Sequence, residues 1–394
     1  MLNFNLALPM HPSPITAARN RIVFIDWLRG LAALIMLQGH TFHAFLRPQE
    51  REGPAFYLSI LLGGQAAAIF LFLTGITYGM GMNRREHLGP WQRMVAALKR
   101  ARYLFLLAVL FRLQTWSFSW PHAPWTDLLH VDVLNLMGAT AALLALLALA
   151  SGTQRFRWAA VAGIVFAVAA PLMADSIFGR LPAALRAYVV PTGDGFSMFP
   201  WGAYLAFGVA AGSVIPLVER QSWSRVMQWV ALLGFALLAG GEYFGNLPWS
   251  VYPHSDFWLN SPALTACKLG NTLLLGAASF LWTEYFSVGW SWVRLLGVNS
   301  LAVYWVHIEL VYGRWFNGYR EKLTAWECVG VAGTLIVLMT AMSFAIMRIK
   351  QARGAASQSR VGIPIPHTPA VPAGLREETR SRSRAARTNQ RQSA

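Results

Sequence analysis

The chain has 394 residues, of which 55% are hydrophobic and only 13% are charged, and its mean hydropathy is +0.41. Soluble domains carry about 25% charged residues, so this composition excludes an ordinary water-soluble enzyme and indicates that most of the chain faces lipid. The net charge of +16 does not indicate a nucleic-acid partner. Much of it comes from a tail after residue 348 whose composition is typical of a disordered segment lying against an anionic membrane surface.

Apolar segments long enough to cross a bilayer, which takes about 20 residues, recur along the chain. We predict about ten membrane-spanning helices, at 23–46, 56–82, 100–118, 129–150, 156–174, 196–215, 226–245, 263–284, 292–313 and 326–348. Most of the 33 Lys and Arg residues fall in alternate connecting segments, as expected of cytoplasmic loops. The predicted fold is therefore an all-α polytopic membrane protein with both termini in the cytoplasm.

This map divides the chain into a cytoplasmic segment at 1–22, a transmembrane domain at 23–348 and a disordered basic tail at 349–394. Membrane lipid is the first expected partner. The sequence contains no acceptor motif for N-glycosylation, which favours a bacterial inner membrane over a membrane of the secretory pathway.

The first predicted span carries the most polar residues. Asp26 and Arg29 lie three residues apart, where they can pair, and Arg29, Ala33, Met36 and His40 follow one helical stripe. About 21 Å along the helix separates Asp26 from His40. Ionisable residues inside a span are costly and are functional candidates. The alternatives are an ion pair that anchors the helix at the interface and a structural histidine hydrogen-bonded between helices.

Polar residues also mark the third, fourth and ninth predicted spans. Arg112 lies near the end of the third span, while Asp132 and Asn135 share a face at the start of the fourth. In the ninth span, Tyr304 and His307 lie on one polar stripe. Because polar residues can also join membrane helices without any further function, a purely structural role for this stripe stays open.

The predicted topology places five ionisable residues in the outer half of the membrane: His40, Arg112, Asp132, Lys268 and His307. Buried charges must be paired or must line a wet cavity, so we predict a shared polar cavity there. For Lys268 the alternative is an ion pair with Glu242. The two cysteines fit neither a disulfide framework nor a metal site, and we predict no metal.

Several motifs carry a family resemblance. They are Arg21-x4-Asp26-x2-Arg29-Gly30 followed by His40, then Gly63–Gly75, Phe111–Gln114, Val131–Gly138, Phe199–Gly202 and Ser300–His307. Together they resemble the membrane acyltransferases related to heparan-alpha-glucosaminide N-acetyltransferase. The motif of the first span also resembles the wider acyltransferase-3 group, whose spacing His40 matches better. The motifs do not identify the substrate.

The resemblance implies an acyl-CoA donor on the cytoplasmic side, with acetyl-CoA expected, and a carbohydrate-like acceptor reached from the other side. It implies that His40 is catalytic, as general base or as nucleophile, supported by Asp26 and Arg29. It further implies that the CoA moiety is held by Arg21, Arg29, Arg84 and Arg85, and that the acceptor is held by Arg112, Asp132, Asn135, Tyr304 and His307. A one-step and an acyl-histidine mechanism both stay open.

The alternative function is a transporter or flippase for a polar solute, and a scaffold or sensor without catalysis is a third option. Transporters usually show internal repeats with broken helices in matching positions. The sequence contains no second copy of the Asp-x2-Arg-Gly pattern, so we predict the acyltransferase. The acceptor, the acyl chain and the oligomeric state, a homodimer included, are left open by the sequence.

Overall fold

The computed structural model describes residues 22–193, 195–286 and 289–360. Nearly all of the predicted N-terminal segment and most of the predicted tail lie outside these ranges. Contacts divide the chain into two units, Met1–Ser343 and Phe344–Ala394. The described residues form helices and turns without any strand, which confirms the all-α prediction.

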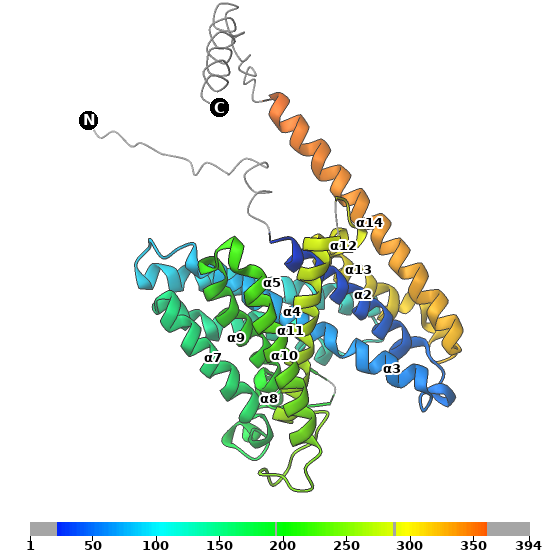
Figure 1. Ribbon diagram of the computed structural model, residues 1–394. Helices are drawn as coiled ribbons and strands as arrows, with labels where there is room; N and C mark the ends of the chain where they lie inside the picture. Colours follow the sequence, from blue (N-terminus) through cyan, green and yellow to red (C-terminus); the bar gives the residue numbers. More distant parts are fainter. Residues whose placement is uncertain (1–21, 194, 287–288, 361–394) are drawn as a thin grey trace, which may run out of the picture. The chain divides into compact units, whose positions relative to one another are not determined.

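The first unit contains twelve described α-helices and the start of α14 (Figure 1). The helices are α2 (Val23–Phe45), α3 (Pro54–Gly63), α4 (Gln65–Asn83), α5 (Pro90–Ser119), α6 (Val133–Leu144), α7 (Gly152–Val168), α8 (Ala183–Val189), α9 (Met198–Val214), α10 (Trp223–Gly245), α11 (Pro262–Leu281), α12 (Trp292–Val298) and α13 (Ser300–Tyr312). Helix α14 (Ala325–Arg360) continues into the second unit, where the Arg348 guanidinium lies 4.9 Å from the centroid of the Phe344 ring.

Six described helical segments are long and apolar enough to cross a membrane. They are Pro54–Asn83, Trp125–Leu149, Met198–Leu217, Arg220–Gly245, Pro262–Phe286 and Ala325–Arg353, and the bent pair α12–α13 would make a seventh. The spans predicted at 23–46, 100–118 and 156–174 fall on α2, α5 and α7. That these three helices also cross, and that both termini are cytoplasmic, stay predictions.

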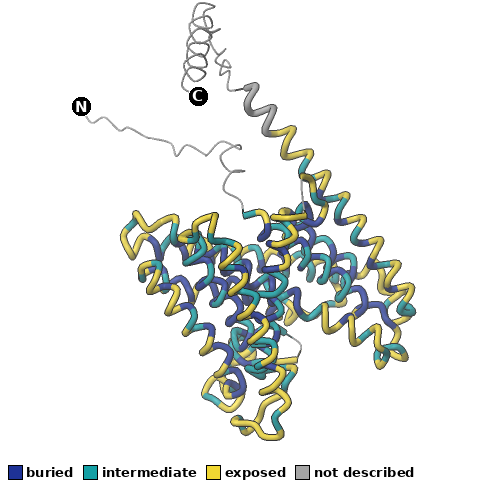
Figure 2. Tube along the Cα trace, viewed as in Figure 1, coloured by how far each residue is buried: buried dark blue, intermediate teal, exposed yellow. Residues whose placement is uncertain are grey.

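The surface of the first unit suits a lipid environment. Figure 2 shows exposed positions alternating with buried ones along most helices. On α10, the large apolar residues Trp229, Leu232 and Phe235 are 68%, 59% and 65% exposed. Exposed apolar side chains in such numbers indicate a surface that contacts lipid rather than water.

The span predicted at 292–313 is not one straight helix. Helices α12 and α13 are bent by 86° at a break, where Asn299 has φ −108° and ψ 18°. The Asn299 amide donates to the backbone carbonyls of Leu295 at 3.2 Å and Ser343 at 3.4 Å. A side chain that binds carbonyl groups beside a break makes irregular backbone tolerable at membrane depth, so Asn299 accounts for the position of the bend.

Glycines allow α4 and α9 to pack backbone against backbone. A Cβ atom placed on Gly208 would lie 2.1 Å from the carbonyl oxygen of Phe72, and one on Gly75 would lie 2.1 Å from that of Leu205. No side chain fits into such distances. Small residues at helix interfaces are a main source of close packing between membrane helices, so this contact is a principal support of the fold.

We expect Gly208→Ala to destabilise the protein by about 1–3 kcal/mol, the usual cost of overpacking. Gly240→Ala is the matched control, because a Cβ atom on this α10 glycine would meet nothing within 4 Å. Alanine is favoured over glycine in helices by about 1 kcal/mol, so the control should unfold at an equal or higher temperature. Thermal unfolding in detergent measures both, and equal effects of the two substitutions would contradict the close α4–α9 contact.

Candidate active site

Helices α2 and α13 bring two histidines together. Nδ1 of His40 lies 2.9 Å from Nε2 of His307, and the rings stack with their centroids 5.2 Å apart. His307 is fully buried, and its Nδ1 lies 2.9 Å from the backbone oxygen of Val303. Two residues that the sequence placed in one cavity are therefore directly hydrogen-bonded.

The hydrogen bonds of this pair assign the ring protons. The Val303 carbonyl can only accept, so Nδ1 of His307 carries a hydrogen and donates it. A neutral imidazole has a single N–H, which leaves Nε2 of His307 to accept from Nδ1–H of His40. Nε2 of a neutral His40 then keeps its lone pair, and the described residues offer it no hydrogen-bond donor. The pair therefore presents a base or nucleophile at one defined atom.

Two tyrosines of α13 flank the histidine pair. The Tyr304 ring centroid lies 5.7 Å from that of His307, and the Tyr312 ring packs edge-on against His40 at 5.4 Å. The Tyr312 hydroxyl lies 3.1 Å from Nδ1 of His43. Tyr312 was not predicted to belong to the site. The sequence signal that could have found it is its position on the same predicted helix, somewhat more than one turn after His307.

Arg112 and Asp132, both predicted to bind the acceptor, form an ion pair. Nε of Arg112 lies 3.2 Å from Oδ2 of Asp132, and the two side chains are 18% and 10% exposed. Oδ1 of Asp132 accepts from the backbone N–H groups of Leu134 and Asn135 at 2.9 Å each. Asp132 thus caps the N-terminus of α6, a structural role that the sequence analysis did not assign to it.

Helix α5 connects this ion pair with the histidine pair. Phe111, next to Arg112, packs against Tyr304 and Trp305 with ring centroids 5.3 and 5.1 Å apart. Asn135 is buried, and its amide donates to the backbone oxygen of His130 at 3.2 Å. Residues of α2, α5, α6 and α13 therefore surround one region.

A second polar network between α5 and α13 was missed by the sequence analysis. Oε1 of the buried Glu309 lies 3.2 Å from both Nε2 of Gln114 and the Thr115 hydroxyl. Oε1 of Gln114 in turn accepts from the indole N–H of Trp305. Trp305 and Glu309 lie one turn apart, so Gln114 ties two positions of α13 to α5. The signal that could have found it is an acidic residue inside a predicted span.

The structure brings four of the five residues predicted to share a cavity into two pairs, and the cavity itself stays a prediction. His40 with His307 and Arg112 with Asp132 form two pairs. The Lys268 ammonium lies 4.7 Å from the centroid of the Trp201 ring and 3.7 Å from the position that a Cβ atom on Gly64 would take, next to the Gly63 that packs against Gly39. The structure does not pair Lys268 with Glu242 among the described residues, and Oε1 of Glu242 instead lies 3.9 Å from Sγ of Cys267.

Among the residues predicted to hold the donor, Arg29 lies on α2 about three turns before His40. Oδ1 of Asp26 and Nη1 of Arg29 are 3.4 Å apart, as the predicted pair requires. Gly63 packs against Gly39 just before α4 begins, so α4 starts beside His40 and ends about 28 Å further along its axis. Arg21 lies outside the described residues.

Beyond the C-terminal end of α4, Arg84 and Arg85 line a cavity of 500 Å³. Helix α5 adds Arg93 and Arg100 to the same cavity, although neither was predicted for the site. Four guanidinium groups around one cavity suit phosphate groups, which arginine binds in bidentate fashion. Within the described part of the chain, no group of His, Cys, Asp and Glu could hold a metal ion.

Comparison with known proteins gives one family match. The family model described as heparan-alpha-glucosaminide N-acetyltransferase, catalytic, matches residues 21–249, more than half of the chain. The matched range includes His40, Arg112 and Asp132 and ends before α13, which contributes His307. No curated protein matches the chain. The family match therefore does not extend to α13, whose contact with His40 is shown by the structure.

Proposed function

The chain belongs to the family of the heparan-alpha-glucosaminide N-acetyltransferase catalytic domain, and on this premise we propose that it is a membrane acetyltransferase of the bacterial inner membrane. It moves an acetyl group from acetyl-CoA on the cytoplasmic side to a hydroxyl or amine of a carbohydrate-like acceptor on the other side. The observation that carries the catalytic assignment is the lone pair on Nε2 of His40, left free by the hydrogen bonds of His307.

In the proposed reaction, Nε2 of His40 takes the proton of the acceptor hydroxyl or amine as that group attacks the thioester carbonyl. A bond forms between the acceptor and the carbonyl carbon, the carbon–sulfur bond breaks, and His40 returns the proton to the CoA thiolate. His307 continues to accept from Nδ1–H of His40, which orients the ring and stabilises its positive charge, as the orienting residue of a catalytic triad does.

The same lone pair can attack the thioester carbonyl directly, so that the carbon–sulfur bond breaks and the CoA thiolate leaves. His40 then holds the acetyl group until the acceptor attacks it and breaks the bond between the carbonyl carbon and Nε2. Both routes depend on the same atom of His40 and on the same hydrogen bond to His307. They differ in one observable: only the second route leaves acetyl label on the protein when no acceptor is present. Intact-mass measurement after mixing with acetyl-CoA separates them.

The acceptor is proposed to lie beside Tyr304, Arg112, Asp132 and Asn135. No hydrogen bond occupies the Tyr304 hydroxyl within the described residues, so it is free to bind a hydroxyl group of a sugar. The Arg112–Asp132 pair, at 18% and 10% side-chain exposure, offers both a donor and an acceptor. Such mixed polar groups are what recognition of a carbohydrate requires.

The donor is proposed to place its phosphates in the arginine-lined cavity of Arg84, Arg85, Arg93 and Arg100. The cavity volume of 500 Å³ is within the range of ligand sites, roughly 300–1,000 Å³. Acetyl-CoA carries its thioester at the end of a long flexible arm, which suits a phosphate site about one helix length from His40. This arrangement supports a donor that enters from the cytoplasmic side.

We expect the double substitution R84Q/R85Q to raise the KM for acetyl-CoA about tenfold or more, with a smaller effect on kcat, because each hydrogen bond between charged groups contributes about 1.5–3 kcal/mol. The matched control is R180Q/R186Q, which removes two exposed arginines of the segment around α8. Steady-state kinetics in nanodiscs measure both. An unchanged KM in the first variant would contradict the proposed phosphate site.

The bend between α12 and α13 favours one second candidate, a transporter for a polar solute. Discontinuous helices line the binding sites of many transporters, and α12 and α13 meet at 86°. Transporters carry such breaks in matching positions of two repeats, whereas the described residues contain one bent pair. Accumulation of labelled sugar in proteoliposomes without acetyl-CoA would favour this function over acetyl transfer.

A further inference from the structure

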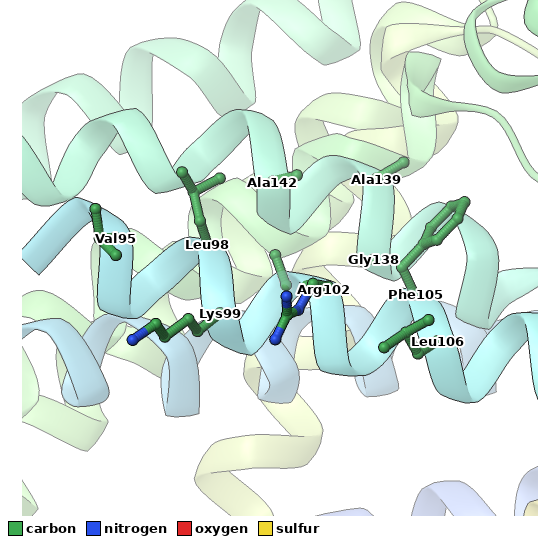
Figure 3. Close-up of a pocket in the computed structure, with 10 residues that line it drawn as sticks. Val95, Leu98, Lys99, Arg102, Phe105, Leu106, Gly138, Ala139 and Ala142 are labelled. Carbon is green, nitrogen blue, oxygen red and sulfur yellow. The ribbon is translucent and has the colours of Figure 1, made fainter.

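An apolar groove runs between α5 and α6 on the surface of the first unit. Its volume is 490 Å³. Figure 3 shows Leu98 pointing from α5 toward Ala142 of α6, with Phe105 and Leu106 further along the groove. The α6 side consists of the small residues Gly138, Ala139 and Ala142, whose short side chains leave room for a ligand.

The groove is charged on its α5 side. Lys99 and Arg102 line it three residues apart, and both are exposed. Neither forms an ion pair with any residue that the structure describes. Two cations beside an apolar channel are complementary to a molecule with an anionic head and a hydrocarbon chain.

This groove is distinct from the proposed donor cavity. At 3.6 residues per turn, Arg93, Ala97 and Arg100, which line the donor cavity, lie on one side of α5. Leu98 and Arg102 line the groove from the opposite side. The groove therefore does not continue the donor cavity toward His40, and its occupant need not be a substrate.

The surroundings identify lipid as the occupant. Beyond the groove, the same helix exposes Val109, Leu110 and Leu113 at 48%, 54% and 47%, so this side of α5 faces the bilayer interior in the proposed topology. Lys99 and Arg102 then lie at the cytoplasmic edge of the apolar surface. Anionic lipid headgroups are enriched at that depth and attract basic residues.

We propose that the groove binds an anionic phospholipid of the cytoplasmic leaflet, with one acyl chain lying between α5 and α6 and the phosphate held by Lys99 and Arg102. A zwitterionic lipid has the same chains, but its headgroup carries a cation that Lys99 and Arg102 repel. The groove is thus selective by charge. This proposal does not depend on the acetyltransferase activity.

The test is native mass spectrometry of the protein released from mixed membranes containing equal amounts of phosphatidylglycerol and phosphatidylcholine. We expect the wild type to retain about 10- to 30-fold more phosphatidylglycerol than phosphatidylcholine, because two basic residues near a membrane surface would attract an anionic headgroup by that factor. In K99Q/R102Q this preference should disappear. The matched control is R157Q/R225Q, which removes two exposed arginines of α7 and α10 and should keep the preference.

A second variant tests the part of the groove that holds the acyl chain, separately from the two basic residues. Ala142 is exposed in the groove, so Ala142→Trp should fill the groove and reduce the amount of either lipid that remains bound, without disturbing the buried packing. Equal retention of the two lipids by the wild type, or an unchanged preference in K99Q/R102Q, would overturn the proposal. Thermal unfolding confirms that each variant is folded before its lipids are counted.

Discussion

Replacing His40 with glutamine is expected to lower kcat for acetyl transfer about 10²- to 10⁴-fold, the usual contribution of a positioned general base. The amide oxygen of glutamine is a far weaker base than the imidazole Nε2 and a poor nucleophile, so both proposed routes lose their reacting atom. The KM for acetyl-CoA should change little, because the proposed phosphate site lies at the other end of α4. The loss is therefore expected in the chemical step.

The matched control is His254→Gln. His254 pairs with Asp175 on the surface and its side chain is 82% exposed, so its removal tests the loss of a histidine without touching the pair. Acetyl transfer to a panel of sugars, followed with labelled acetyl-CoA in nanodiscs, measures both variants. Comparable rates for His40→Gln and the wild type would rule out His40 as the reacting group.

Removing the partner histidine should have the second-largest effect. In His307→Leu the Nδ1–H of His40 loses its buried hydrogen-bond acceptor. The His40 ring is then no longer held in the orientation and tautomer that leave the Nε2 lone pair free. We expect kcat to fall about 10- to 100-fold, the effect of losing a residue that orients a metal-binding histidine. His307→Gln keeps an amide oxygen near the former Nε2 position and should recover much of this loss. The conservative variant thus separates positioning from bulk packing.

The double variant H40Q/H307L provides the decisive comparison for this second prediction. Residues that act as a unit are strongly non-additive, so the double variant should be no slower than His40→Gln alone. Full additivity of the two losses would mean that His307 acts on the reaction independently of His40. Equal rates for His307→Leu and His307→Gln would show that only the volume of the side chain matters.

Sequence reasoning predicted the features that depend on a single helix. The stripe of Tyr304 and His307 and the spacing of Asp26 and Arg29 follow from 3.6 residues per turn, and the structure keeps each set on its helix. Apolar segments of spanning length, together with the hydrophobic composition, predicted the all-α fold. These inferences need no knowledge of how one helix is rotated against another.

Contacts between helices could not be predicted from the sequence. Rotation and tilt of membrane helices are set by their neighbours. The predicted topology therefore placed His40 and His307 in the same half of the membrane without showing their hydrogen bond. The bend at Asn299 was hidden because apolar residues continue on both sides of it. Likewise, Asp132 as a helix cap and Lys268 over Trp201 depend on local geometry that hydropathy does not record.

The measurement that tests the proposed function most directly is release of CoA from acetyl-CoA by the purified protein in nanodiscs, with and without a panel of sugars. We expect release that rises with a suitable acceptor and is lost in His40→Gln. A folded wild-type protein that neither binds nor cleaves acetyl-CoA, while a related enzyme does so under the same conditions, would contradict the acetyltransferase and leave the transporter as the better account.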